Sequence, residues 1–290
     1  MFAKTLIMKI YHITTNHFLD RLWFKDIDDF KAAMNYVAVV SSLHKVKVLA
    51  FILMSNHVHV VLYCSEEEAK AFIDTLKKLY GIYYARKYNV SNFFRRVKVN
   101  ISAVEGKEAA ERAIAYVQMN CVAANICPTP FFYPWGTGSC FFNENPEPGI
   151  PLESLSRRAQ IKLIKSNVKL PSTMRLSEKG YILPESYVNV KGVESLFQTS
   201  KRYDYFMRNS SKASKALERD AMPSFSDQTV LASANDLCMS LFRTKSLGAL
   251  TRNQKSELLK QLRQRFSADI NQLCRVIGLS YEEAAELLAY

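Results

Sequence analysis

Apolar residues in the first part of the chain repeat with two periods, one typical of strands and the other of helices. Residues 9–14 alternate and are rich in β-branched and aromatic side chains, which predicts a first strand. From Asp26 to His44 the apolar positions recur every three or four residues behind an acidic start, which predicts an amphipathic helix. The apolar run Val46–Tyr63 is long enough for two strands with a turn at Ser55-Asn56.

The two periods continue to alternate as far as the aromatic segment near residue 136. An acidic cap at 65–68 predicts the start of a second long helix, which ends near Tyr88. Residues 93–101 are predicted to form an unusually basic fourth strand, and residues 107–124 a third helix. The order β-α-β-β-α-β-α fits an α+β fold, a four-stranded antiparallel sheet with helices on one face, in which an inner strand carries His57 and His59.

A proline-rich stretch divides the chain into two parts of similar length. We predict a first domain at 1–143, a linker at 144–151 and a mostly α-helical C-terminal domain at 152–290. Two units are also what a chain of 290 residues leads one to expect.

The last segment, 267–290, is predicted to form two short helices hinged at Gly278, with Ser280 and Glu283 as a capping box. That spacing suits a helix-turn-helix. The second helix is acidic, however, and its carboxylates would be repelled by DNA phosphates. Two roles are left open for this element: recognition of DNA, and packing against the rest of the protein without any contact to DNA.

Charge and cysteine usage limit the class of protein. Lys and Arg number 39 against 27 Asp and Glu, a formal charge of +12 that is spread over both parts of the chain. Such a surplus favours a polyanionic partner, most often nucleic acid. No apolar run reaches membrane-spanning length and no signal peptide is expected, so we predict a cytoplasmic protein with reduced thiols. The six scattered cysteines lack paired spacing, which makes a structural zinc site unexpected.

Candidate chemistry centres on His57 and His59, which share one face of a strand because successive side chains point to opposite faces. A His-x-His pair also arises by chance, but on a rigid strand it makes half of a metal site. In the third helix Tyr116 and Asn120 are four residues apart and lie on one face. If that face looks at the sheet, two imidazoles and an amide oxygen suit Mg²⁺ or Mn²⁺ bound to a phosphate. The alternative for Tyr116 is an ordinary half-buried aromatic residue.

These residues carry a resemblance to a known family. The His-Val-His motif looks like that of HUH nucleases, and the chain resembles the single-tyrosine transposases, in particular the insertion-sequence 200-like group that includes the REP-associated tyrosine transposases (RAYTs). Five ordered motifs between residues 8 and 136 carry the resemblance: Tyr11–Thr14, Met54–Val61, Phe94–Lys98, Tyr116–Ala124 and Tyr133–Trp135.

The resemblance implies a ferredoxin-like (HUH) fold for the first domain and a role for each site residue. His57 and His59 would be metal ligands, Asn120 the third ligand and Tyr116 the nucleophile. A divalent metal, Mg²⁺ or Mn²⁺, and attack by the phenolate would cleave and rejoin single-stranded DNA through a 5′-phosphotyrosine. The implied partner is single-stranded DNA with hairpin-forming repeats, and the chain would act as a monomer or a homodimer.

Basic and aromatic side chains are the further DNA contacts that the resemblance suggests. Phosphates would meet basic residues on the fourth strand and at the preceding helix end, and bases would stack on aromatic residues. These are Arg86, Lys87, Arg95, Arg96 and Lys98 for phosphates, and Trp23, Phe93 or Phe94 for bases. The alternative for the basic residues is a solvated edge strand whose charges discourage aggregation.

The chain departs from the family pattern at two positions. Ser55 and Cys121 stand where relatives commonly have proline, which puts the positioning of Asn120 in doubt but removes no ligand. Histidines 12, 17 and 44 match no catalytic position and are expected to be structural or surface residues.

Two other functions are left open. One is a domesticated DNA-binding protein or regulator that keeps the fold without cleavage. The other is a zinc-dependent hydrolase, which requires another His, Cys or carboxylate near the histidine pair.

Overall fold

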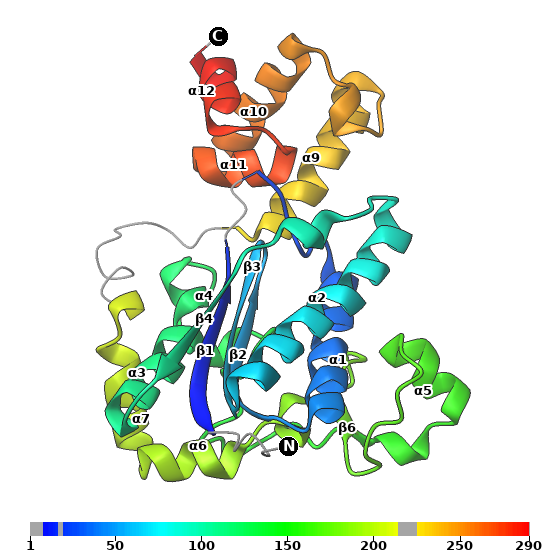
Figure 1. Cartoon of the computed structure of the whole chain (residues 1–290). Helices are drawn as coiled ribbons and strands as arrows, with labels where there is room; N and C mark the ends of the chain where they lie inside the picture. Colours follow the sequence, from blue (N-terminus) through cyan, green and yellow to red (C-terminus); the bar gives the residue numbers. More distant parts are fainter. Residues whose placement is uncertain (1–7, 17–19, 214–224, 290) are drawn as a thin grey trace, which may run out of the picture.

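A four-stranded antiparallel sheet forms the centre of the α+β fold (Figure 1). The computed structural model describes residues 8–16, 20–213 and 225–289. The strands lie in the order β2-β3-β1-β4, with β3 an inner strand, so the predicted place of His57 and His59 is confirmed. Their bounds are β1 (Lys9–Thr15), β2 (Lys47–Met54), β3 (His57–Cys64) and β4 (Val99–Val104).

Both long helices begin where their acidic start signals predict. The helix α1 (Ile27–His44) is capped by Asp26, whose side chain accepts a hydrogen bond from the backbone N–H of Asp29. The helix α2 (Glu66–Tyr88) starts with a capping box between Ser65 and Glu68. Caps of this kind satisfy backbone N–H groups that have no partner inside the helix.

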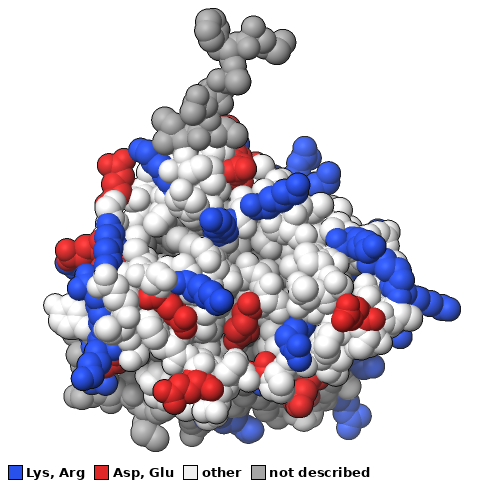
Figure 2. Space-filling view, turned by 90° about the horizontal axis from the view of Figure 1, so that it is seen from below, with Lys and Arg blue, Asp and Glu red and all other residues white. Residues whose placement is uncertain are grey.

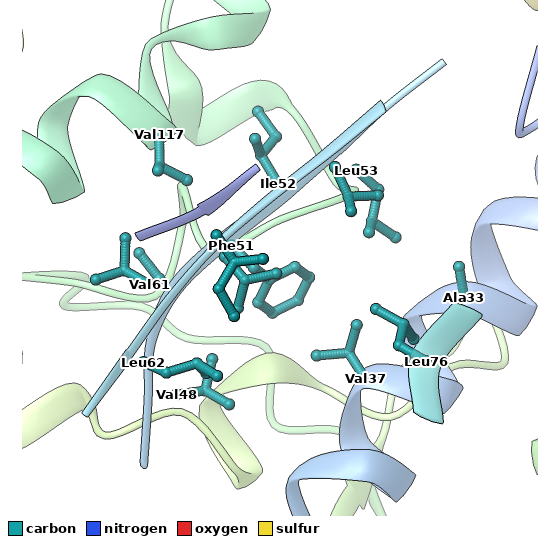
Figure 3. Packing of buried hydrophobic residues seen from close by; sticks show 14 of the residues in the cluster. Ala33, Val37, Val48, Phe51, Ile52, Leu53, Val61, Leu62, Leu76 and Val117 are labelled. Atoms are coloured by element: carbon teal, nitrogen blue, oxygen red, sulfur yellow. The ribbon is translucent and has the colours of Figure 1, made fainter. Parts of the chain in front are cut away.

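Helices cover both faces of the sheet, which corrects the expectation of helices on one face. Figure 3 shows Phe51 and Leu53 on the side of Val37 in α1, and Ile52 on the side of Val117 in α3 (Lys107–Gln118). Every residue of β2 after Lys47 is buried, because strand alternation sends apolar side chains to both faces and both are covered.

The predicted fourth strand is wrong in its first half. Residues Phe93–Arg96 form a 3₁₀ turn, η1, and the strand begins only at Val99. The side chain of Phe94 is buried, with its ring centroid 4.7 Å from that of Trp23 and 5.2 Å from that of Tyr80. Aromatic packing therefore turns the chain inward where the alternation of residue types suggested an extended strand.

The proline- and aromatic-rich segment covers the outer edge of β2. It contains the short turn η2 (Pro130–Phe132) and then runs beside the strand, where the N–H of Leu53 donates to the carbonyl of Trp135. A Cβ on Gly136 would lie 2.7 Å from the carbonyl oxygen of Phe51, so only glycine permits this approach. Covering the edge satisfies backbone groups that an exposed edge strand leaves open.

The remaining chain is mostly helical, as predicted, with one two-stranded sheet. Its elements are β5 (Ile150–Pro151), η3 (Leu152–Ser154), α5 (Arg157–Ile164), β6 (Arg175–Leu176), η4 (Pro184–Ser186), α6 (Val190–Phe197), α7 (Ser200–Arg208), α9 (Asp227–Phe242), η5 (Leu247–Ala249), α10 (Arg252–Phe266), α11 (Ile270–Ile277) and α12 (Tyr281–Ala289). The predicted capping box of the last helix is present, because Ser280 and Glu283 bond each other's backbone N–H groups.

Hydrophobic clusters join residues on both sides of the predicted linker, and the predicted domain bounds themselves stay a prediction. The main cluster joins the sheet to residues as far as Ala213, including Phe197 and Phe206. A second cluster packs α9, α10, α11 and α12 against one another. A third joins α1 to residues 152–182. The proline-rich segment 144–151 therefore does not separate two hydrophobic cores.

Charged side chains are dispersed over the one face of the molecule that Figure 2 draws. In the face drawn in Figure 2, basic residues alternate with acidic ones and do not gather into one patch. In the part of the chain that the structure describes, no helix has both the length and the apolar character needed to cross a bilayer.

Candidate functional site

The face of the sheet toward α3 carries a group of polar side chains. Thr14 on β1 lies opposite His59 on β3, and His12 lies opposite Val61. Directly paired residues share a face, and alternation adds His57 to the same face. The rings of His57 and His59 lie with their centroids 5.0 Å apart, so the predicted pairing of the two imidazoles is present.

Asn56 fixes the orientation of His57. The Nδ1 atom of His57 lies 2.8 Å from Oδ1 of Asn56. An amide oxygen only accepts hydrogen bonds, so Nδ1 carries the hydrogen and the lone pair of the neutral ring is on Nε2. This is the arrangement in which metal-binding histidines are usually held, with the second ring nitrogen bonded to a neighbouring group.

His59 is held by two residues of β1. Its Nδ1 atom lies 2.8 Å from Oγ1 of Thr14 and 3.2 Å from Nε2 of His12. The rings of His12 and His59 are stacked, with centroids 5.4 Å apart. Burial lowers the pKa of His12 to about 4, so this ring is neutral at pH 7 and does not repel a cation.

His12 therefore belongs to the site, although the sequence suggested only a structural or surface residue. The signal was present in the alternation of β1, which puts His12 and Thr14 on the face that pairs with His59. His44 is not on this strand. Its Nε2 atom lies 2.9 Å from Oγ1 of Thr75, a contact that suits a structural residue. His17 lies outside the described residues.

Tyr116 lies on α3 with its ring against the histidines. Its centroid is 5.7 Å from that of His59 and 5.7 Å from that of His12, with the rings close to perpendicular in both pairs. The side chain is half-buried. The ammonium of Lys212, after α7, lies 4.7 Å from the centroid of the Tyr116 ring. Tyrosine and histidines thus meet within one chain.

Asn120 is oriented by the end of α3. The helix is interrupted at Met119, and Asn120 opens the single turn α4 (Asn120–Ala123), so the predicted continuous helix is wrong at this point. The Nδ2 group of Asn120 donates to the carbonyl of Tyr116 at 2.9 Å and to that of Val117 at 3.2 Å. Because the amide nitrogen faces these carbonyls, Oδ1 is turned away from them.

A cleft of about 610 Å³ contains part of this site. His57 and Asn120 line it from one side, and residues of α9 and α11 line it from the other. Tyr116 instead lines a neighbouring cavity of about 550 Å³ between β4, α3 and the chain after α7. Lys212 lines the cleft while its ammonium lies over the Tyr116 ring, so it connects the two spaces.

The ligand chemistry of these residues fits a divalent cation with open coordination positions. Imidazole nitrogens and an amide oxygen are ligands that Mn²⁺ and Mg²⁺ accept. Within residues 8–16, 20–213 and 225–289, no group of three or more His, Cys, Asp or Glu side chains is arranged to hold a metal ion. His12 lies beside the histidine pair, as a zinc hydrolase would require of a further ligand, but in those ranges it forms no metal-holding group with His57 and His59. The set His57, His59 and Asn120 stays a prediction.

Three of the predicted DNA contacts have structural roles instead. Trp23 is only 2% exposed, and its ring packs against Tyr80 and Phe94, which corrects the expectation that it stacks on a base. Phe94 is buried as well. The ammonium of Lys87 lies 2.6 Å from a carboxylate oxygen of Asp26 and 2.7 Å from one of Asp29, so its charge is already balanced.

The other predicted basic contacts are exposed. Arg86 lies in the last turn of α2, and Arg95 and Arg96 lie on the turn η1, which contacts α2. Lys98 is exposed just before β4. None of the four is among the residues that line the cleft with His57. Their role as phosphate contacts stays a prediction.

Comparison with known proteins gives one distant likeness. No family model matches the chain, and no curated protein matches it. Among solved structures, a REP-associated tyrosine transposase bound to a REP hairpin is similar over 47% of this chain and 81% of its own, with 12% identity and a TM-score of 0.38. A likeness this weak does not by itself assign the chain to a family.

Proposed function

We propose that this protein cleaves and rejoins single-stranded DNA with a divalent metal, using Tyr116 as the nucleophile. The observation that carries the proposal is the contact between Tyr116 and His59 within one chain, with ring centroids 5.7 Å apart. The proposal is also supported by His57 and Asn120, which line one cleft. A phenol next to two imidazoles and an amide oxygen supplies both a nucleophile and metal ligands.

In the proposed mechanism, His57, His59 and Asn120 would hold a divalent metal, Mg²⁺ or Mn²⁺, which would supply Lewis-acid polarisation of the scissile phosphate. The Tyr116 phenolate attacks phosphorus, and the bond from phosphorus to the 3′-oxygen breaks. The leaving oxygen takes a proton and becomes a free 3′-hydroxyl, while the 5′-phosphate stays on the tyrosine. Attack by another 3′-hydroxyl on this phosphotyrosine releases Tyr116 and restores a DNA phosphodiester.

Two residues that are neither the proposed nucleophile nor proposed metal ligands support this chemistry. Lys212 places a positive charge over the Tyr116 ring, where it would attract a bound phosphate. Thr14 bonds Nδ1 of His59 and so orients the ring. Tyr116 reaches the histidines of its own chain, which supports action in cis.

The finer family features belong to the same proposal. We infer a ferredoxin-like HUH domain from the order β-α-β-β-α-β and the strand order β2-β3-β1-β4. By the sequence resemblance, the substrate is single-stranded DNA close to a hairpin.

The test is formation of a covalent adduct between the protein and a single-stranded hairpin oligonucleotide in Mn²⁺. We expect an adduct that survives denaturing electrophoresis and is lost in Tyr116→Phe and in the absence of divalent metal. His57→Ala should also lose the adduct. An adduct of unchanged yield in Tyr116→Phe would refute the role of this tyrosine.

A second function, DNA binding without cleavage, is favoured by one observation. Tyr116 does not line the cleft that contains His57 and Asn120. Oligonucleotide binding with no adduct and no strand scission, under the same conditions, would support this function and contradict the first.

A further inference from the structure

Two exposed phenylalanines line the cleft that contains His57 and Asn120. Phe132 ends the turn η2 and is 66% exposed, and Phe225 precedes α9 and is 49% exposed. Large apolar side chains are usually buried, and an exposed aromatic residue beside polar groups often marks a binding surface.

The backbones that carry these rings are fixed. The N–H of Phe132 bonds the carbonyl of Thr129 at 3.2 Å. The carbonyl of Phe225 accepts a hydrogen bond from Nε2 of Gln272 at 2.8 Å, and its ring packs edge-on against Phe266 with centroids 5.1 Å apart. The backbone of Phe132 and the ring of Phe225 are therefore held in place before any ligand arrives.

The charges in the cleft are compatible with an anionic ligand. Two carboxylates line it, and both are engaged within the protein. Asp227 is bonded to Arg275 and to the hydroxyl of Ser55, and Asp269 accepts the backbone N–H of Gln272 at the start of α11. Lys212 lines the same cleft and brings a positive charge to the side on which Tyr116 lies.

We propose that the cleft binds a single-stranded nucleic acid whose bases stack on Phe132 and Phe225. Aromatic platforms beside a cation are the usual means of binding single strands, because every unpaired base offers a flat face. A duplex hides those faces and would not stack in this way. The inference rests on the proposed function, and it adds the base contacts and assigns one wall of the substrate site to the C-terminal helices.

The experiment measures binding of a fluorescently labelled oligo-dT to the full chain by anisotropy, without divalent metal so that no cleavage occurs. We expect Phe132→Ala and Phe225→Ala each to raise the Kd about 10-fold, as the loss of one stacked base does. Phe132→Tyr should bind as the wild type does. Circular dichroism and thermal melting check that each variant is folded.

Phe131 provides a matched control. It neighbours Phe132, with the two ring centroids 5.6 Å apart, and is 52% exposed, but it is not among the residues that line the cleft. We expect Phe131→Ala to lose less affinity than Phe132→Ala, because it removes only a ring that packs edge-on against Phe132. Equal losses for Phe131→Ala and Phe132→Ala, unchanged binding in both cleft variants, or absence of oligo-dT binding by the wild type would each overturn the inference.

The outcome is separable from that of the cleavage assay. Phe-dependent binding without a covalent adduct leaves the inference standing and contradicts cleavage through Tyr116. A covalent adduct, together with binding that does not depend on either phenylalanine, contradicts the inference and leaves cleavage through Tyr116 standing.

Discussion

At the scale of single residues, the hydrogen bonds behind the two imidazoles decide whether the site can work. Asn56 fixes the tautomer of His57, and Thr14 lies within 2.8 Å of the inner nitrogen of His59. Neither residue is a proposed ligand. Each holds a ring so that its other nitrogen points in one direction, which is what a metal site requires of its supporting residues.

Replacing Thr14 with valine should weaken Mn²⁺ binding about 10-fold, because the side chain keeps its shape but no longer bonds His59. Thr14→Ser keeps the hydroxyl and should retain most of the affinity. Titration calorimetry of the protein with Mn²⁺ measures both. Equal affinity in the wild type and in Thr14→Val would show that His59 needs no such support or is not a ligand.

How much of the site was predictable depended on the distance along the chain between its parts. The pairing of His57 with His59 follows from strand alternation alone. The place of His12 depends on which strands become neighbours, and that of Lys212 on where the chain returns after α7. The burial of Trp23 does not follow from its local sequence, because it comes from α2 and η1, which follow it by many residues.

At the scale of elements, α1 and α2 are joined by a buried carboxylate. Asp29 in α1 is fully buried and accepts hydrogen bonds from the phenols of Tyr83 and Tyr88 and from the ammonium of Lys87. Burial raises the pKa of both phenols, and the neighbouring Asp29 raises it further, so they remain protonated donors. Removing this charge leaves Lys87 without one of its two carboxylates.

We expect Asp29→Asn to lower the free energy of unfolding by about 2 kcal/mol, since one member of a buried ion pair is lost while Lys87 stays partly solvated. Asp28→Asn is the matched control because Asp28 is the exposed neighbour on the same helix turn. Urea unfolding followed by circular dichroism measures both. Similar stability in the two variants would contradict a stabilising role for the buried group.

Elements were predictable where local signals act alone. The starts of α1 and α2 and the last helix follow from capping residues. The turn η1 was read as a strand because alternation does not reveal that Phe94 packs against Trp23. Helices on the second face were missed because the number of covered faces depends on the tertiary arrangement.

At the scale of the whole molecule, the C-terminal helices contact the sheet close to the histidines. Asp227 in α9 accepts the hydroxyl hydrogen of Ser55 at 2.6 Å and pairs with Arg275 of α11. Ser55 lies two residues before His57, in the turn between β2 and β3. This contact therefore couples the position of α9 to that of β3, the strand that carries His57 and His59.

Asp227→Ala should lower the melting temperature of the C-terminal helices, because Arg275 and Ser55 then lose their shared partner. Scanning calorimetry should resolve a transition that moves to lower temperature than in the wild type. Asp236→Ala, on the exposed side of the same helix, should leave the profile unchanged. A shift of the same size in both variants would show that the contact with Ser55 has no special role.

The organisation of the whole molecule was the hardest level to predict. The helical character of residues 152–290 follows from periodicity, but the packing of Phe197 and Phe206 into the main cluster does not. A proline-rich stretch indicates an irregular segment. Which hydrophobic surfaces meet on either side of it depends on the folded chain.

The most direct test of the central claim is to locate the covalent bond to DNA. The protein is incubated with a single-stranded hairpin oligonucleotide and Mn²⁺, digested, and analysed by mass spectrometry. We expect a nucleotide joined through its 5′-phosphate to the peptide that contains Tyr116, together with a released strand that ends in a 3′-hydroxyl. Attachment to a different residue, or a 3′-phosphate linkage, would contradict the central claim.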